Sequence, residues 1–196
     1  MTTRFLTILH ISDLHISSAN DAARQALQRT VFDRFWDYIR AWKQDPKEVQ
    51  PDMIIATGDL ARTGSESEYG LGITGGATAS DKSVDAFLTR LCTEFSLPRN
   101  RVVLTPGNHD VDRTLMTPIH AKGDLDVISD KVTLAELFFN KTMCGTREDI
   151  FRRLNPFIQF YRHFMGIPSS SECEDNINLL YAPTRLGFAD GLPVDV

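Results

Sequence analysis

The stretch PDMIIATGDL, residues 51–60, contains an apolar run that ends in a glycine and an aspartate. A short continuous run of Met, Ile and Ala is typical of a strand that is covered on both faces, as in a parallel sheet. We expect a strand over residues 52–57, with Gly58 and Asp59 at its carboxyl end. The same order, an apolar run and then polar residues, occurs twice more in the chain.

The first of these is RFLTILHISDLHIS, residues 4–17. It predicts a strand over residues 4–11, followed by Asp13 and His15. Burying charge at a strand end costs free energy unless a partner offsets it, and a metal ion is one such partner. An aspartate and a histidine two residues apart point the same way from an extended segment, so both can reach one ion.

The other is RVVLTPGNHD, residues 101–110. It predicts a strand over residues 101–105 and then a tight turn that carries Asn108 and His109. In parallel α/β sheets, ligands gather at the carboxyl ends of the strands. We therefore expect three separate strand ends to deliver metal-binding side chains to one edge of one sheet.

Amphipathic segments separate the three expected strands. A helix is predicted over residues 21–42, where apolar residues recur at steps of three and four: Leu27, Val31, Phe35, Ile39 and Trp42. A loop rich in Gly, Ser and Thr follows over residues 64–80, and then a second helix with one apolar face: Val84, Phe87, Leu88, Leu91 and Phe95. This alternation of strands and helices predicts an α/β fold with right-handed crossovers.

The pattern is less regular after Asp112. RLNPFIQFYRHFMG, residues 153–166, predicts a helix that is capped by Asn155, has Pro156 in its first turn and ends at Gly166. The remaining expected elements are a loop, a short helix and a strand, over residues 117–131, 132–140 and 178–183.

Composition narrows the class of protein. The 196 residues are enough for one domain, and the net charge of -5 argues against a broad nucleic-acid-binding surface. No apolar run approaches the roughly 20 residues that cross a bilayer. The three cysteines are widely spaced and form no C-x-x-C pair, which argues against a disulfide framework or a thiolate zinc site and fits a cytoplasmic location.

Histidine nitrogens together with carboxylate and amide oxygens suit Mn²⁺, Fe²⁺ or Zn²⁺ better than Ca²⁺. A carboxylate has two oxygens, so one aspartate can bridge two ions. Two metal ions about 3.5–4 Å apart can activate a water and clamp both oxygens of a phosphoryl transfer. A nearby histidine that is not a ligand can donate a proton to the leaving oxygen.

Three blocks of this sequence resemble the calcineurin-like metallophosphoesterases: Asp13-Leu14-His15, Gly58-Asp59 and Gly107-Asn108-His109-Asp110. The family carries them as D-x-H, G-D and G-N-H-D or G-N-H-E, in this order and after successive strands. The resemblance covers residues 4–113, and it implies the family's α/β sandwich with a mainly parallel sheet core.

The resemblance also implies a role for each residue of the blocks. Asp13 and His15 would bind the first of two divalent metal ions, and Asp59 would bridge both ions. Asn108 would bind the second ion and touch the phosphate. His109 would act as the acid or orient the phosphate, with Asp110 as its supporting partner.

Two departures from the family pattern matter. The protein-phosphatase branch continues its G-D block with an aspartate and an arginine, whereas here Arg62 and Thr63 stand at those places. This argues against a phosphoprotein substrate and leaves Arg62 as either a phosphate contact or a solvated loop residue. The family's later histidine blocks have no counterpart among His10, His120 and His163.

We therefore interpret residues 1–196 as the N-terminal part of one metallophosphoesterase domain, truncated after its first half. The motif-bearing core is residues 4–113, and residues 114–196 are expected to be helical or irregular. The exposed sheet is expected to pack against the missing C-terminal half.

The expected function of the full-length protein is hydrolysis of a phosphomonoester or phosphodiester by metal-bound hydroxide. A nucleotide or a nucleic acid is favoured over a phosphoprotein as the substrate. The chain by itself is expected to turn over little. The alternative is a non-catalytic module that keeps the fold and binds a metal ion or a partner protein without hydrolysing anything.

Overall fold

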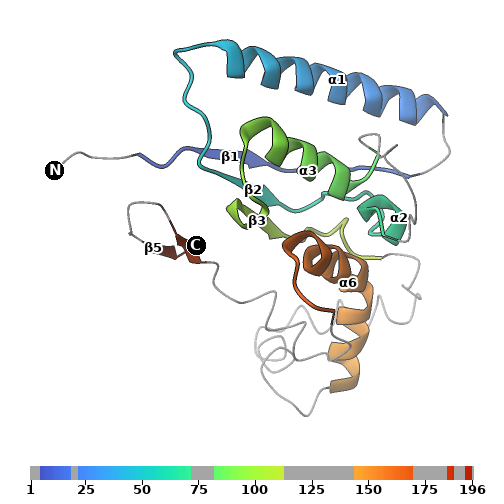
Figure 1. Cartoon of the computed structure of the whole chain (residues 1–196). Helices are drawn as coiled ribbons and strands as arrows, with labels where there is room; N and C mark the ends of the chain where they lie inside the picture. The colour runs from blue at the N-terminus through green and yellow to red at the C-terminus, as the bar shows by residue number, and fades with distance from the viewer. Residues whose placement is uncertain are drawn as a thin grey trace.

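The computed structural model describes residues 5–18, 22–71, 82–112, 144–169, 185–187 and 193–195. Three parallel strands form the central sheet in the order β1-β2-β3, with β2 in the middle (Figure 1). Their bounds are Ile8–Ile11, Met53–Thr57 and Val102–Thr105. The parallel α/β sheet expected from the three apolar runs is confirmed.

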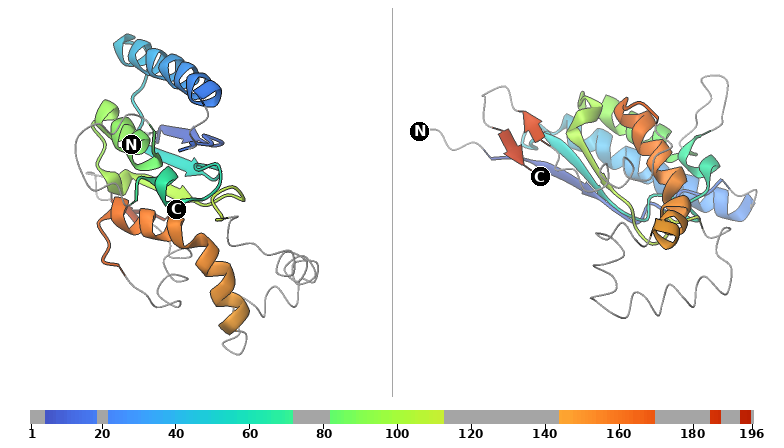
Figure 2. Two further views of the ribbon diagram at one scale, coloured as in Figure 1. Left: turned by 90° about the vertical axis from the view of Figure 1, so that its right-hand side faces the viewer. Right: turned by 90° about the horizontal axis from the view of Figure 1, so that it is seen from below.

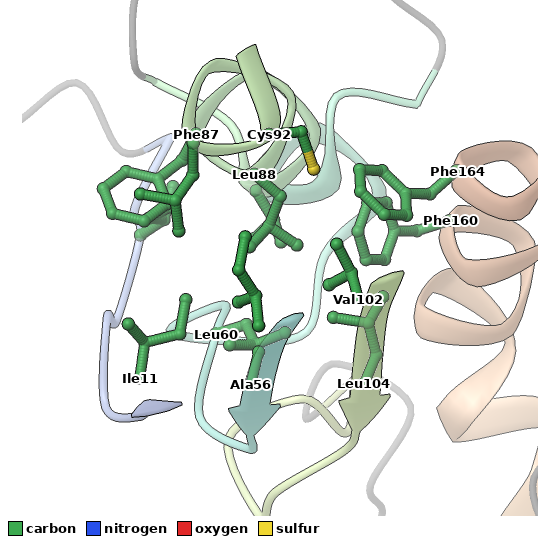
Figure 3. Close-up of a cluster of buried hydrophobic side chains, with 14 of the residues drawn as sticks. Ile11, Ala56, Leu60, Phe87, Leu88, Cys92, Val102, Leu104, Phe160 and Phe164 are labelled. Atoms are coloured by element: carbon green, nitrogen blue, oxygen red, sulfur yellow. The ribbon is translucent and has the colours of Figure 1, made fainter. Parts of the chain in front are cut away.

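The register of the strands sorts their side chains onto two faces. On one face, Ile54 lies between Leu9 and Val102, and Ala56 lies between Ile11 and Leu104. These residues belong to the hydrophobic core or pack against it. Figure 3 shows Ala56, Val102 and Leu104 pointing towards side chains of the helices.

The opposite face of the sheet is more open. Ile8 is 44% exposed, and Ile55 and Val103 are only partly buried. Met53 on this face is nevertheless buried, so the described structure covers this face in part. Packing of this face against further residues of the same protein stays a prediction.

Helices α1, Ala22–Gln44, α3, Val84–Phe95, and α6, Cys144–Met165, lie on the same side of the sheet (Figure 2). Side chains from all three helices share one core with the strands. Every apolar residue predicted for the face of α3 is buried, because that face is enclosed by α1, α6 and the sheet. None of the helices in the described part of the chain combines the length and apolarity of a membrane span.

The buried face of α1 differs from the predicted one in the first half of the helix. Leu27 and Val31 are 66% and 54% exposed, whereas Phe32 and Trp36 are buried; Ile39 is buried as predicted. The rings of Phe32 and Trp36 lie 5.1 and 5.0 Å from the ring of Phe87. Aromatic rings bury more apolar area than Leu or Val, so their packing determines which side of the helix faces the core.

Helix α6 starts earlier than predicted. Asn155 does not cap it, and Pro156 lies inside the helix instead of in its first turn. An internal proline removes one backbone hydrogen bond, a cost that the burial of Phe157 and Phe160 offsets. The end of the helix is as predicted: Gly166 follows it with a φ of 68°.

Several smaller elements complete the structure. The stretch predicted as a loop over residues 64–80 contains a short helix, α2, Glu66–Tyr69. A 3₁₀ turn, η1, spans Arg99–Arg101, and an unpredicted antiparallel pair joins β4, Arg185–Gly187, to β5, Pro193–Asp195. The elements predicted over 117–131, 132–140 and 178–183 lie outside the described residues.

Substitutions on α1 distinguish the observed face from the predicted one. We expect Ile39→Ala to lower the free energy of unfolding by about 2–5 kcal/mol, because it leaves a cavity in the core. We expect Val31→Ala on the exposed side to change it by less than about 0.5 kcal/mol. Chemical denaturation of both variants measures the difference, and equal losses would contradict the observed orientation of α1.

Candidate metal centre

The loops that follow β2 and β3 touch each other through two glycines. Gly58 has a φ of +72°, and a Cβ atom at this position would lie 2.8 Å from the Cα atom of Gly107. A Cβ atom at Gly107 would overlap the carboxylate of Asp59 and lie 2.5 Å from its backbone nitrogen. Only glycine at both positions allows the two backbones to approach this closely.

The loop after β1 joins the same assembly through backbone hydrogen bonds. The amide of His15 donates to the carbonyl of Asp59 at 2.9 Å, and the amide of Ile16 donates to the carbonyl of Leu60 at 2.9 Å. The amide of Asp13 donates to the carbonyl of Gly58 at 3.3 Å. The pairing between the first two strands therefore continues into the loops and brings the first two motif blocks together.

The buried side chain of Asp110 links the loop after β2 to the loop after β3. Its side chain is fully buried, and it accepts hydrogen bonds from the amides of Gly107, Ala61 and Leu60 at 2.8, 2.9 and 3.3 Å. A carboxylate that accepts several N–H groups offsets its loss of hydration. Asp110 therefore supports the loops, and through Gly107 it supports the neighbourhood of His109 indirectly.

Tyr69 is the fourth donor to Asp110. Its hydroxyl lies 2.7 Å from the Oδ1 atom, and burial together with the Asp110 carboxylate raises the pKa of Tyr69 well above its usual value. The tyrosine therefore stays protonated and keeps donating. Its ring stacks on Phe160 at 5.2 Å, which connects Asp110 and the loops it supports to the aromatic side chains of α6.

Three of the predicted metal ligands have left-handed backbone conformations. The φ angles of Asp13, His15 and Asp59 are 56°, 46° and 53°. In the described residues only one other non-glycine residue, Ser96 at the end of α3, has a positive φ. Such conformations cost about 1 kcal/mol or more each and concentrate at functional sites.

These φ angles correct one step of the sequence argument. Asp13 and His15 lie beyond the end of β1 and have left-handed backbone conformations, so the alternation of an extended strand does not place their side chains. Their side chains still approach each other, with the His15 Nε2 atom 3.9 Å from the Asp13 Oδ1 atom. The two residues meet as predicted, but with a different backbone geometry.

The structure assembles ligand atoms of His15, Asp59 and His109 within 4.8 Å of one another. The two imidazole rings meet edge to face, with their centroids 4.6 Å apart. Two nitrogens and a carboxylate oxygen at this separation fit a divalent transition metal ion. The group contains two of the predicted ligands, His15 and Asp59, together with His109, which the sequence predicts as the acid and not as a ligand.

His109 is held at two atoms. Its amide donates to the Oδ1 atom of Asp59 at 2.9 Å, and its Nδ1 atom lies 2.9 Å from the carbonyl oxygen of Arg62. A carbonyl can only accept, so the Nδ1 atom carries the hydrogen in this arrangement. The Nε2 atom of the neutral ring is then the nitrogen with a free lone pair.

Sequence reasoning missed the part that Arg62 plays here. Its main-chain carbonyl orients His109, and no motif letter reports a backbone contact. The side chain of Arg62 is part-buried, and its contact with the phosphate stays a prediction. Asn108 is exposed between Gly107 and His109, and its role as a ligand likewise stays a prediction.

Comparison with known proteins agrees with the geometry. The family model for calcineurin-like phosphoesterases matches residues 6–186 of the chain. An uncharacterized metallophosphoesterase-like protein of Bacillus subtilis (strain 168), YydB, is 26% identical over 190 residues. The match covers 92% of this chain and 31% of YydB, so the chain spans about a third of the length of that relative. No solved structure gives a significant match.

Gly107→Ala tests whether the close approach of the loops builds the metal site. The added methyl group overlaps the Asp59 carboxylate, so we expect metal affinity to fall by about 10- to 100-fold, the range found when supporting residues are changed. Titration with Mn²⁺ by calorimetry measures this.

Gly166→Ala is the matched control. Its φ is +68°, but a Cβ atom there meets no atom within 4 Å. We expect a loss of about 1 kcal/mol in stability and unchanged metal affinity. Normal Mn²⁺ affinity in Gly107→Ala would show that the glycine contact does not shape the site.

Proposed function

The chain belongs to the calcineurin-like phosphoesterases, and on this basis we propose that the full-length protein hydrolyses a phosphomonoester or a phosphodiester with two divalent metal ions. The observation that carries the proposal is the convergence of His15, Asp59 and His109 within 4.8 Å. Each of these residues comes from a different loop at the carboxyl edge of the sheet.

Asp13 and His15 bind the first ion in this proposal, Asp59 bridges the two ions, and Asn108 binds the second. The positions of His15, Asp59 and the neighbouring Asp13 carboxylate support the assignment. Bound divalent ions supply Lewis acidity, which lowers the pKa of a coordinated water to about 7 and offsets charge on the phosphoryl oxygens. Mn²⁺, Fe²⁺ and Zn²⁺ all suit the donor set.

His109 is the proposed proton donor to the leaving oxygen. Its Nδ1–H group is engaged by the Arg62 carbonyl, so in the doubly protonated ring the Nε2–H group gives its proton to the leaving oxygen and the neutral Nδ1–H ring remains. The amide bond to Asp59 holds the histidine backbone against the same carboxylate that binds the ions. The Arg62 side chain is proposed to contact the phosphate.

A phosphodiester, such as one in a nucleotide or a nucleic acid, is the proposed substrate class. Thr63, which stands where the protein-phosphatase branch has its arginine, donates its hydroxyl to Glu68 at 2.9 Å. A threonine has no positive charge to place against a substrate phosphate, and the hydroxyl of this one is engaged by Glu68. A cytoplasmic location completes the proposal, and Cys92, a free buried thiol whose pKa burial raises to about 11, agrees with it.

Asp59→Asn tests the bridging role. The substitution removes one negative charge from the ligand set, and we expect the rate at which the full-length protein hydrolyses bis(p-nitrophenyl) phosphate with Mn²⁺ to fall by about 100-fold or more. Asp33→Asn, which changes an exposed carboxylate on α1, is expected to leave the rate unchanged. Retention of most activity by Asp59→Asn would remove Asp59 as the bridge, and metal binding without hydrolysis in the unmodified full-length protein would favour the non-catalytic alternative.

His109→Ala tests the acid role against a ligand role. We expect hydrolysis to fall by about 100- to 10,000-fold while Mn²⁺ affinity changes little. The loss should be larger for diphenyl phosphate than for bis(p-nitrophenyl) phosphate, because the poorer leaving group needs its proton more. A fall in Mn²⁺ affinity as large as that of Asp59→Asn would instead make His109 a metal ligand.

A further inference from the structure

Glu68 is a buried carboxylate that the proposed reaction does not use. Its side chain is only 2% exposed, on α2. One of its oxygens, Oε2, accepts from the amide of Thr63 at 2.8 Å, the hydroxyl of Thr63 at 2.9 Å and the amide of Ser65 at 3.4 Å. The carboxylate therefore holds the loop after β2 from the side of α2.

The amide of Thr63 belongs to the same peptide unit as the carbonyl of Arg62. Peptide units are planar, and the described residues contain no cis bond, so this N–H and this C=O point in opposite directions. The N–H points to Glu68, and the C=O points to the Nδ1 atom of His109 at 2.9 Å. One peptide unit thus lies between a buried carboxylate and the histidine of the site.

We propose that Glu68 is a positioning residue for His109 and acts through the peptide unit that joins Arg62 to Thr63. A carboxylate that accepts from the N–H polarises the unit and makes its carbonyl oxygen a stronger acceptor. The carbonyl then keeps the hydrogen of His109 on Nδ1 and presents Nε2 to the metal edge. The catalytic meaning of this arrangement rests on the proposed function, but the arrangement of hydrogen bonds does not.

Neighbouring contacts make the peptide unit a rigid connection. The amide of Arg62 donates to the carbonyl of Ile16 at 3.0 Å, and the amide of Ala61 donates to Asp110 at 2.9 Å. Glu68 fixes the next amide along the chain. Rotation of the unit, which would swing the Arg62 carbonyl away from His109, therefore also breaks the bond from the Thr63 amide to Glu68.

The imidazole ¹⁵N chemical shifts of His109 in the metal-free protein at pH 8.5 test the proposal, because they report which ring nitrogen carries the hydrogen. We expect mainly the Nδ1–H form in the unmodified protein. In Glu68→Gln, which keeps the shape of the side chain but removes its charge, we expect a clear shift towards the Nε2–H form. We also expect the rate of diester hydrolysis to fall about 10- to 100-fold, as when residues that support ligands are changed.

Two control variants separate this role from a general effect on folding. Glu66→Gln changes an exposed carboxylate on the same helix and should alter neither the His109 shifts nor the rate. Thr63→Val removes the hydroxyl that donates to Glu68 but keeps the amide, so the Nδ1–H form should persist. Loss of that form in Thr63→Val would overturn the route through the peptide unit.

The unmodified protein provides a measurement that needs no variant to fold. A spectrum with His109 mainly in the Nε2–H form would overturn the proposal by itself, and so would unchanged shifts in a folded Glu68→Gln protein. These outcomes are independent of the proposed function, whose failure would appear as a lack of hydrolysis while the His109 spectrum stays as expected.

Discussion

The backbone contact between Gly58 and Gly107 is the constraint on which the site depends. It brings the carboxyl ends of β2 and β3 together more closely than any side chain would permit. Asp59 and His109, which follow these glycines, are thereby linked by a hydrogen bond of 2.9 Å from amide to carboxylate. The approach of Asp59 to His109 therefore depends first on the backbone and only then on the side chains.

Two buried carboxylates stabilise the loop that leaves β2. Asp110 accepts from the amides of Leu60 and Ala61, and Glu68 accepts from the amides of Thr63 and Ser65. Hydrogen bonds to charged acceptors are about twice as strong as neutral ones, which helps to offset the left-handed conformation of Asp59 and its neighbours in the site. Ligands held in strained conformations by a rigid loop have little freedom to lose when an ion binds.

The helices support this edge from one side of the sheet. Phe87 on α3 lies against the aromatic residues of α1, and Phe160 on α6 stacks on Tyr69, whose hydroxyl reaches Asp110. The core of the domain is in this way continuous with the loops that carry the ligands. A tyrosine with an apolar ring and a polar hydroxyl is suited to connect the two environments.

The sequence by itself determined the three parallel strands and the two helices between them. It also determined that Asp13, Asp59 and Asn108 follow the carboxyl ends of these strands. Short apolar runs and ordered motif blocks are local features, so these elements could be predicted to within a few residues. Local patterns also predicted the apolar face of α3, since all of its apolar residues lie on one side.

Only the tertiary structure decided how these parts meet. Phe32 and Trp36 face the core instead of Leu27 and Val31, because packing against Phe87 outweighs the regular spacing of the smaller residues. The left-handed turns of the ligands and the links from Glu68 and Asp110 were also absent from the sequence argument. These features depend on backbone groups. Because every residue except proline has the same backbone donor and acceptor, a pattern of side chains cannot indicate which backbone groups will meet.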